Sequence, residues 1–149
     1  MTGKGSLNHN SRKFHAKNTD PNRTHWNVEY CNEDIKDVYH ELFDDALKRY
    51  NDKQTRKDRK IDDYYEKIRS GKQEKLFHEV ILQIGDKDNM GSETMEGQLA
   101  AKILDEYMKG FQERNPTLRV FAAHLHLDEA TPHLHIDFIP YVTRSEERR

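Results

Sequence analysis

The sequence HLHLDEATPHLHID, residues 124–137, contains four of the chain's nine histidines. Histidines alternate with Leu or Ile on both sides of the central DEATP (128–132). Successive side chains of a strand point to opposite faces of a sheet. The pattern therefore predicts a hairpin of two strands, 117–127 and 133–142, with one face bearing histidines and the other face apolar.

Three of these histidines have the spacing of a metal site. Neighbouring strands lie roughly 4.8 Å apart, and same-face neighbours along one strand lie roughly 6.7 Å apart. His126, His133 and His135 can therefore converge on one divalent ion, for which imidazole is a common ligand. Three protein ligands leave coordination positions open for water or substrate, as in catalytic sites. Glu129, in the turn, is close enough to bind the ion or to accept a proton.

Residues next to the three histidines have possible roles around the predicted metal site. Asp128 and Asp137 are candidates for orienting the imidazoles, whereas His124 is placed outside the site. The alternative is a solvated sheet face that carries histidines without binding metal.

The rest of the chain favours an α+β fold, a central and largely antiparallel sheet with flanking helices. Residues 1–32 are rich in Gly, Ser, Asn and Thr and are expected to be mainly loop. Asn32 is expected to cap the first helix, segment 33–75 to be helical, and 76–149 to form a strand, a helix and the hairpin. The individual elements expected are helices over 33–50, 61–70 and 99–115 and a strand over 76–84.

The composition narrows the class of protein. The 149 residues suit one domain, and charged residues make up 35% of them. No apolar run reaches the length of a membrane span. The single cysteine, Cys31, excludes an internal disulfide and fits a reducing compartment. The net charge of -2 conceals a basic block at 48–75, with eleven Lys or Arg against six Asp or Glu, which fits either a polyanion-binding surface or a solvated helical face.

Three motifs point to one family. They are HLDEATPHLH at 126–135, NHNSR at 8–12 and NTDPNRTHWNVEY at 18–30. Together they resemble the HUH endonucleases, and most closely the MobV (Pre/Mob, plasmid recombination) relaxases. The resemblance implies a relaxase-like fold and a metal-dependent nickase with site and strand specificity. Such enzymes cleave one DNA strand at a plasmid or mobile-element transfer origin, stay joined to the 5′ phosphate, and later reseal the strand.

The resemblance also implies residue roles. His126, His133 and His135 would hold Mn²⁺ or Mg²⁺, and Glu129 would be a catalytic acidic residue. His9 would be the nucleophile. The expected partner is single-stranded or hairpin DNA at a transfer origin, in the bacterial cytoplasm and without a membrane.

Three further residues are candidates for DNA contacts, and two tyrosines are candidates for the nucleophile. Arg12 would lie near the phosphate by the same resemblance. Arg23 would contact phosphate or tie down its loop. Trp26 would stack on a base or pack the loop onto the domain. Tyr30 and Tyr141 are the rival nucleophiles, since related HUH enzymes use tyrosine.

The chain departs from the family pattern in two places. Only eight residues precede His9, so the sheet is expected to lack an edge strand. The chain ends soon after the hairpin, so residues 1–149 are expected to be a truncated relaxase catalytic domain. A rolling-circle replication initiator, a non-cleaving DNA-binding module and an unrelated metal hydrolase remain as alternatives.

Overall fold

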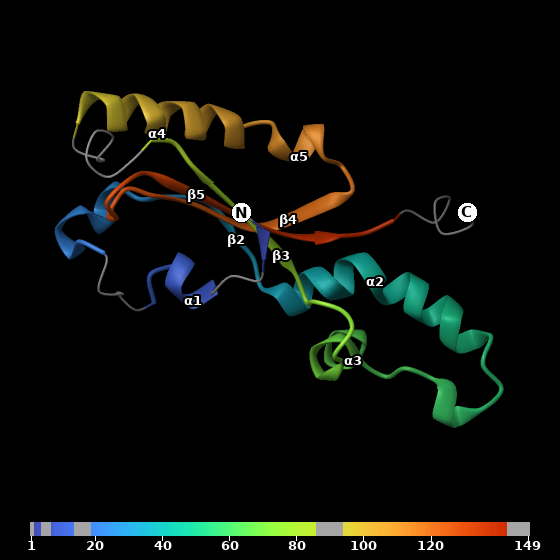
Figure 1. The fold of residues 1–149 in the computed structure, drawn as a ribbon. Coiled ribbons are helices and arrows are strands. Elements are labelled where there is room, and N and C mark those ends of the chain that lie inside the picture. The colour runs from blue at the N-terminus through green and yellow to red at the C-terminus, as the bar shows by residue number, and fades with distance from the viewer. Residues whose placement is uncertain (1, 4–6, 14–18, 86–93, 143–149) are drawn as a thin grey trace.

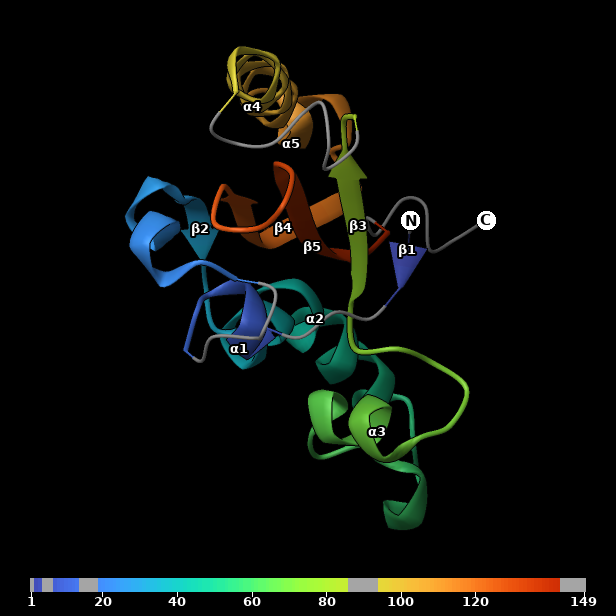
Figure 2. The same cartoon turned by 60° about the vertical axis from the view of Figure 1, so that its left-hand side comes forward.

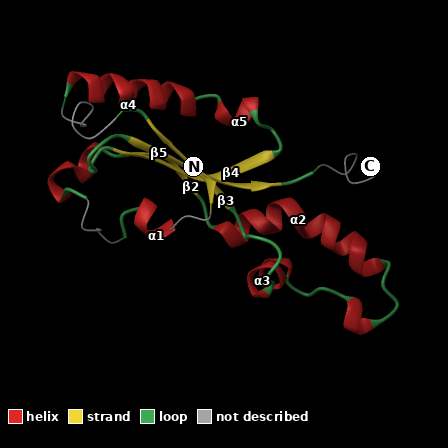
Figure 3. Ribbon diagram, viewed as in Figure 1, coloured by secondary structure: helices red, strands yellow, loops and turns green. Residues whose placement is uncertain are grey.

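Five antiparallel strands form the centre of the structure, a computed structural model in which residues 2–3, 7–13, 19–85 and 94–142 are described. Their order across the sheet is β1-β3-β5-β4-β2. Helices flank this sheet, so the α+β fold expected from the sequence is confirmed (Figure 3). The strands are β1 (Thr2–Gly3), β2 (Val28–Asn32), β3 (His78–Gln83), β4 (Leu118–His126) and β5 (His133–Pro140).

Helices lie on both faces of the sheet (Figure 1). Helices α4 and α5 cover one face, and α1, α2 and α3 lie on the other. The helices are α1 (Leu7–Asn10), α2 (Ile35–Asp52), α3 (Tyr64–Ser70), α4 (Met95–Met108) and α5 (Phe111–Arg114), with the 3-10 turns η1 (Pro21–Trp26) and η2 (Lys57–Arg59).

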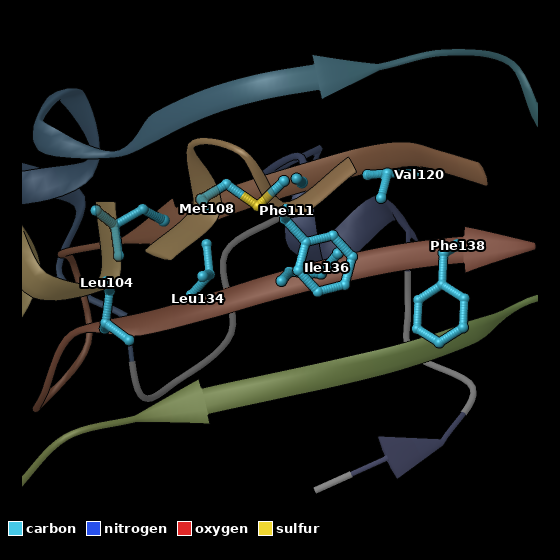
Figure 4. Close-up of a cluster of buried hydrophobic side chains, with 9 residues drawn as sticks. Leu104, Met108, Phe111, Val120, Leu134, Ile136 and Phe138 are labelled. Carbon is cyan, nitrogen blue, oxygen red and sulfur yellow. The ribbon is translucent and has the colours of Figure 1, made fainter. Parts of the chain in front are cut away.

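The face toward α4 and α5 is apolar. Leu104, Met108 and Phe111 of the helices pack against Leu134 and Ile136 of β5 (Figure 4). Both of these strand residues are 0% exposed. Burial of this apolar face drives the packing of helices on the sheet, and it leaves the alternate residues of the hairpin to the opposite face.

The opposite face is divided along its length. Toward one end, side chains of α2 and α3 form a second apolar cluster with Phe121 and Ile139. Toward the β4–β5 turn, the short helix α1 lies over the sheet (Figure 2). The polar residues of the hairpin therefore lie between the sheet and α1.

A bulge in β4 decides which face the histidines occupy. Val120 lies opposite Phe138 and Ala122 lies opposite Asp137, so Phe121 is the extra residue. Strict alternation would place the even-numbered residues after Val120, the histidines included, on the α4 face. Because the extra residue reverses the alternation, Ala122 packs in the cluster of α2 and α3 instead.

Four local expectations were wrong. Residues 28–32 form edge strand β2 rather than loop, and Asp34, not Asn32, caps α2 by accepting from the amides of Lys36 and Asp37. The two-residue strand β1 pairs with β3, so the edge of the sheet is not bare. Gly110, with φ of 84°, interrupts the third helix and separates α4 from α5.

Most of the expected loop 85–94 lies outside the described residues. Among the helices that the structure describes, none has an apolar stretch of the length needed to cross a membrane.

Candidate active site

The β4–β5 hairpin brings its histidines together at one end of the sheet. His126 pairs with His133 across the strands, and His124 pairs with His135. The ring centroids of His126 and His135 are 4.5 Å apart, whereas those of His133 and His135 are 6.4 Å apart. The expected hairpin is confirmed, and His126 and His135 are its most closely facing imidazoles.

His126, Glu129 and His135 form a buried group whose ligand atoms all lie within 4.8 Å of one another. Two of the ring nitrogens, His126 Nδ1 and His135 Nε2, are buried without a hydrogen-bond partner among the described residues. A buried lone pair without a partner is unfavourable. Two such nitrogens beside a carboxylate are a donor set suited to a divalent transition-metal ion. The residues present therefore fit a metal ion at this end of the hairpin.

The protonation states suit the same role. Burial, and the adjacent His135, lower the pKa of His126 to about 3, so its imidazole is neutral near pH 7. Burial opposes ionisation of Glu129, but its contacts with His133, His126 and Arg12 outweigh burial and lower its pKa to about 2. Neutral imidazole and ionised carboxylate are the forms that bind metal.

His133 is held by other partners in this structure. Its Nδ1 lies 2.6 Å from the carbonyl oxygen of Thr131 and 3.0 Å from Glu129 Oε2. Its Nε2 lies 3.1 Å from Gln83 Oε1. The compact group thus contains Glu129 in place of His133, and the role of His133 as a metal ligand stays a prediction.

Helix α1 places His9 against the hairpin turn. His9 Nε2 lies 3.5 Å from Glu129 Oε1, and its ring centroid is 6.1 Å from that of His126. Arg12 Nη1 lies 3.3 Å from the same His9 nitrogen and donates to the His9 carbonyl oxygen at 2.7 Å. His9 Nε2 therefore lies between the Glu129 carboxylate, which accepts, and the Arg12 guanidinium, which donates. The residue that the resemblance implies as nucleophile therefore adjoins the metal-capable group.

Arg12 locks α1 onto the turn. Its φ is 59°, which is uncommon for a residue other than glycine. Its Nε and Nη2 donate to the two carboxylate oxygens of Asp128 at 2.8 and 2.6 Å, and Nη2 also lies 3.1 Å from Glu129 Oε1. Burial opposes ionisation of Asp128, but Arg12 and Thr24 lower its pKa to about 2. Arg12 thereby fixes Glu129, and its position near a phosphate stays a prediction.

The segment around η1 clamps the same turn from the other side. The Asp20 amide donates to the Asp128 carbonyl oxygen at 2.6 Å, and Thr24 Oγ1 donates to the Asp128 carboxylate at 3.0 Å. The Leu127 amide donates to Asn27 Oδ1 at 2.6 Å. The sequence-based prediction gave these residues no role, although Asp20, Thr24 and Asn27 all belong to the motif at 18–30. That motif was the signal that could have identified them.

Arg23 and Trp26 differ in their surroundings. Arg23 Nη2 donates to the Glu129 carbonyl oxygen at 3.3 Å and its Nε donates to Asp20 at 3.2 Å. Arg23 therefore ties η1 to the turn, and its contact with phosphate stays a prediction. Trp26 is 41% exposed, with its ring edge-to-face with His25. Trp26 is thus partly exposed, and its stacking on a base stays a prediction.

Asn10 and Glu79 are buried beside the histidines and were absent from the sequence-based prediction. Asn10 Nδ2 donates to Glu79 Oε2 at 2.5 Å and to Asp137 Oδ2 at 3.3 Å, and Glu79 Oε1 lies 3.4 Å from His135 Nδ1. Burial and the Glu79 carboxylate raise the pKa of Asp137 to about 9. The signal in the sequence was an acidic residue inside the apolar run LFHEVILQI (76–84).

The two rival tyrosines lie away from this group. The Tyr30 hydroxyl donates to Asp105 of α4 at 2.5 Å, on the other face of the sheet, and burial with Asp105 raises the pKa of Tyr30. The Tyr141 hydroxyl donates to the carbonyl oxygen of Pro116 at 2.9 Å, beyond the opposite end of β5. Of the three residues considered as nucleophile, only His9 contacts the group.

A sheet flanked by helices, with a histidine–carboxylate group at one end, is the arrangement expected from the family that the sequence resembles. The profile of the plasmid recombination enzyme family matches residues 4–149, and the chain belongs to that family. No curated protein matches the chain.

Similar solved structures include those of the MobM relaxase domain (MOBV; Mob_Pre) bound to oriT DNA of plasmid pMV158, with manganese. The crystal structure at pH 5.5, with 22-nucleotide DNA, is 27% identical and has a TM-score of 0.52. The structure at pH 6.8, with 22-nucleotide DNA carrying a 3′ thiophosphate, is 26% identical and has a TM-score of 0.49. Each match covers 92% of this chain and 63% of the MobM domain, so the chain spans less than two thirds of that domain.

Proposed function

We propose that this chain is a metal-dependent DNA relaxase domain that nicks one strand at a plasmid or mobile-element transfer origin. The observation that carries the proposal is the position of His9 beside the buried group of His126, Glu129 and His135. Membership of the plasmid recombination enzyme family supports it. So does the likeness to a MobM domain that binds oriT DNA and manganese. The expected location is the bacterial cytoplasm, where such DNA would be found.

His9 is the proposed nucleophile. Its Nε2 lone pair attacks the phosphorus, and the Nε2–P bond forms as the bond from phosphorus to the 3′ oxygen breaks. The imidazolium loses its Nδ1 proton, and the leaving 3′ oxygen takes up a proton. The product is a phosphoramidate on the 5′ phosphate and a free 3′ hydroxyl. Attack by a 3′ hydroxyl reverses the step, so resealing needs no nucleotide cofactor.

The surrounding residues prepare this step. His126, Glu129 and His135 would hold the cation, Mn²⁺ or Mg²⁺, with His133 orienting Glu129 or joining the ligands. When bound, such a cation supplies positive charge at the non-bridging oxygens of the phosphate. Arg12 holds Glu129 and donates to the carbonyl oxygen of His9, which keeps the His9 segment beside the group.

Two other surfaces would contact the DNA. Trp26 would stack on an unpaired base, which fits single-stranded or hairpin DNA. The basic block at 48–75 spans the end of α2, η2 and α3, and its segment 53–60 carries five Lys or Arg and one Asp. All six of these charged side chains are exposed. We assign this segment to phosphate contacts.

Formation of a covalent adduct tests the proposal. The protein is incubated with Mn²⁺ and 3′-labelled single-stranded DNA, either the pMV158 oriT strand or a pool of randomised sequence, and is resolved on a denaturing gel. Wild type should retain the label in an acid-labile adduct, because a phosphoramidate hydrolyses in acid and a phosphotyrosine does not. His9→Ala should abolish the adduct, whereas Tyr30→Phe and Tyr141→Phe should retain it.

Different outcomes would overturn different parts of the proposal. An acid-stable adduct that survives His9→Ala would exclude His9 as nucleophile. Tight DNA binding without any adduct, with or without Mn²⁺, would favour the non-cleaving binding module. A rolling-circle initiator would form the same adduct on replication-origin DNA rather than on transfer-origin DNA.

A further inference from the structure

Asn10 joins the segment of His9 to the histidine–carboxylate group by two separate contacts. It directly follows His9 in the last position of α1 and is 2% exposed. Its backbone carbonyl oxygen lies 2.7 Å from His126 Nε2. Its side-chain amide donates to Glu79 at 2.5 Å and to Asp137 at 3.3 Å. One residue therefore touches one histidine directly and reaches another through Glu79.

The contact with the backbone determines the tautomer of His126. A carbonyl oxygen can only accept a hydrogen bond. His126 Nε2 must therefore carry the proton, and its lone pair lies on Nδ1. That Nδ1 is the buried nitrogen without a partner, 3.9 Å from Glu129 Oε1.

The side chain of Asn10 acts on His135 in a corresponding way. Its amide N–H holds the carboxylate of Glu79, whose other oxygen lies 3.4 Å from His135 Nδ1. A carboxylate in this position accepts from an Nδ1–H. The lone pair of His135 is then on Nε2, the second buried nitrogen without a partner.

We propose that Asn10 is a positioning residue that sets the tautomers of His126 and His135. The lone pairs on His126 Nδ1 and His135 Nε2 then face the proposed cation site, to which Glu129 also belongs. The same residue fixes the position of His9 relative to that site. Metal binding and the placement of the nucleophile are therefore coupled through one buried residue, by its backbone carbonyl at His126 and by its side chain at Glu79. This inference rests on the proposed metal-dependent function, but its first test requires neither metal nor DNA.

The first test is the tautomeric state of the histidines in the metal-free wild-type protein near pH 7. Nitrogen-15 NMR of the imidazole rings distinguishes protonated from unprotonated ring nitrogens. The expected result is Nε2–H for His126 and Nδ1–H for His135. The opposite tautomer at either residue would overturn the proposal, whether or not the protein nicks DNA.

The second test measures Mn²⁺ binding without DNA, by the electron paramagnetic resonance signal of free Mn²⁺. Asn10→Ala should weaken binding by about tenfold or more, as expected when a partner of a metal ligand is lost. It should also make the NMR signals of His135 a mixture of tautomers. Asn8→Ala, an exposed side chain two positions earlier in α1, is the matched control and should bind as wild type does.

The outcomes separate this inference from the proposed function. Wild-type Mn²⁺ affinity together with unchanged tautomers in Asn10→Ala would refute the positioning role and leave the nicking proposal untouched. The predicted tautomers in a wild type that forms no DNA adduct would refute nicking and support the positioning role. If Asn10→Ala does not fold, the wild-type tautomers alone decide the question.

Discussion

Asp128→Asn removes the charge from a buried ion pair while keeping the size of the side chain. Asp128 is 0% exposed and accepts two hydrogen bonds from Arg12, at 2.8 and 2.6 Å. The pair with Arg12 and the bond from Thr24 lower the pKa of Asp128 from 3.8 to about 2, against the effect of burial. At about 1.4 kcal/mol for each pKa unit, the ionised carboxylate contributes roughly 2.5 kcal/mol to the free energy of unfolding.

The pH dependence of this contribution has a definite sign. The pKa is lower in the folded state than in the unfolded state, so the contribution is fully present above about pH 4. It is lost as the pH falls through about 2. The difference between wild type and Asp128→Asn should therefore be largest near neutral pH and should shrink between pH 4 and pH 2.

Urea denaturation in the presence of EDTA measures the effect without bound metal. At neutral pH, Asp128→Asn should lower the free energy of unfolding by about 2–3 kcal/mol, and the Tm by roughly 5–10 °C. Asp58→Asn is the matched control, because its ion pair with Arg56 is exposed and should contribute less than about 1 kcal/mol. An effect of Asp128→Asn as small as that of the control, or one that does not shrink in acid, would refute the reasoning.

Three further predictions concern the core and the proposed DNA contacts. Phe121→Ala removes a ring that is 0% exposed and packs edge-to-face with Phe77, and it should lower the free energy of unfolding by about 3–5 kcal/mol in urea. Trp26→Ala should leave the Tm unchanged but weaken binding of single-stranded DNA by about 1–3 kcal/mol in fluorescence anisotropy, and unchanged affinity would exclude stacking. Replacing Lys57, Arg59 and Lys60 together with Gln should flatten the plot of log affinity against log salt by about 0.7 for each lost contact to single-stranded DNA. An unchanged slope would instead identify the segment as a solvated surface.

The hairpin could be predicted from the sequence because its information is local. Alternation of His with Leu or Ile defines two faces, and the polar DEATP (128–132) marks the turn between them. The same local pattern brought His126 and His135 together in the prediction. Edge strand β2 could not be predicted in this way, because its residues are half exposed and lack regular alternation.

Which residues surround the histidines depends on contacts between segments that are distant in the chain. Asn10 meets Glu79 and Asp137 across separations of 69 and 127 residues, and nothing near Asn10 in the sequence indicates these partners. The place of Glu129 in the compact group likewise depends on Arg12, 117 residues away. These contacts exist only after the sheet has formed and α1 has packed against it.

By itself, the sequence determined the types of the main elements, the hairpin and the meeting of His126 and His135 on one face, because side-chain type and spacing act within a few positions. Only the tertiary structure decided which face the histidines occupy. The bulge at Phe121 reverses the alternation of β4 and turns His126 toward α1, away from the apolar layer of α4. Such a bulge becomes favourable through burial on both faces at once, with Val120 in one core and Phe121 in the other. That balance belongs to the whole fold and not to any short stretch of sequence.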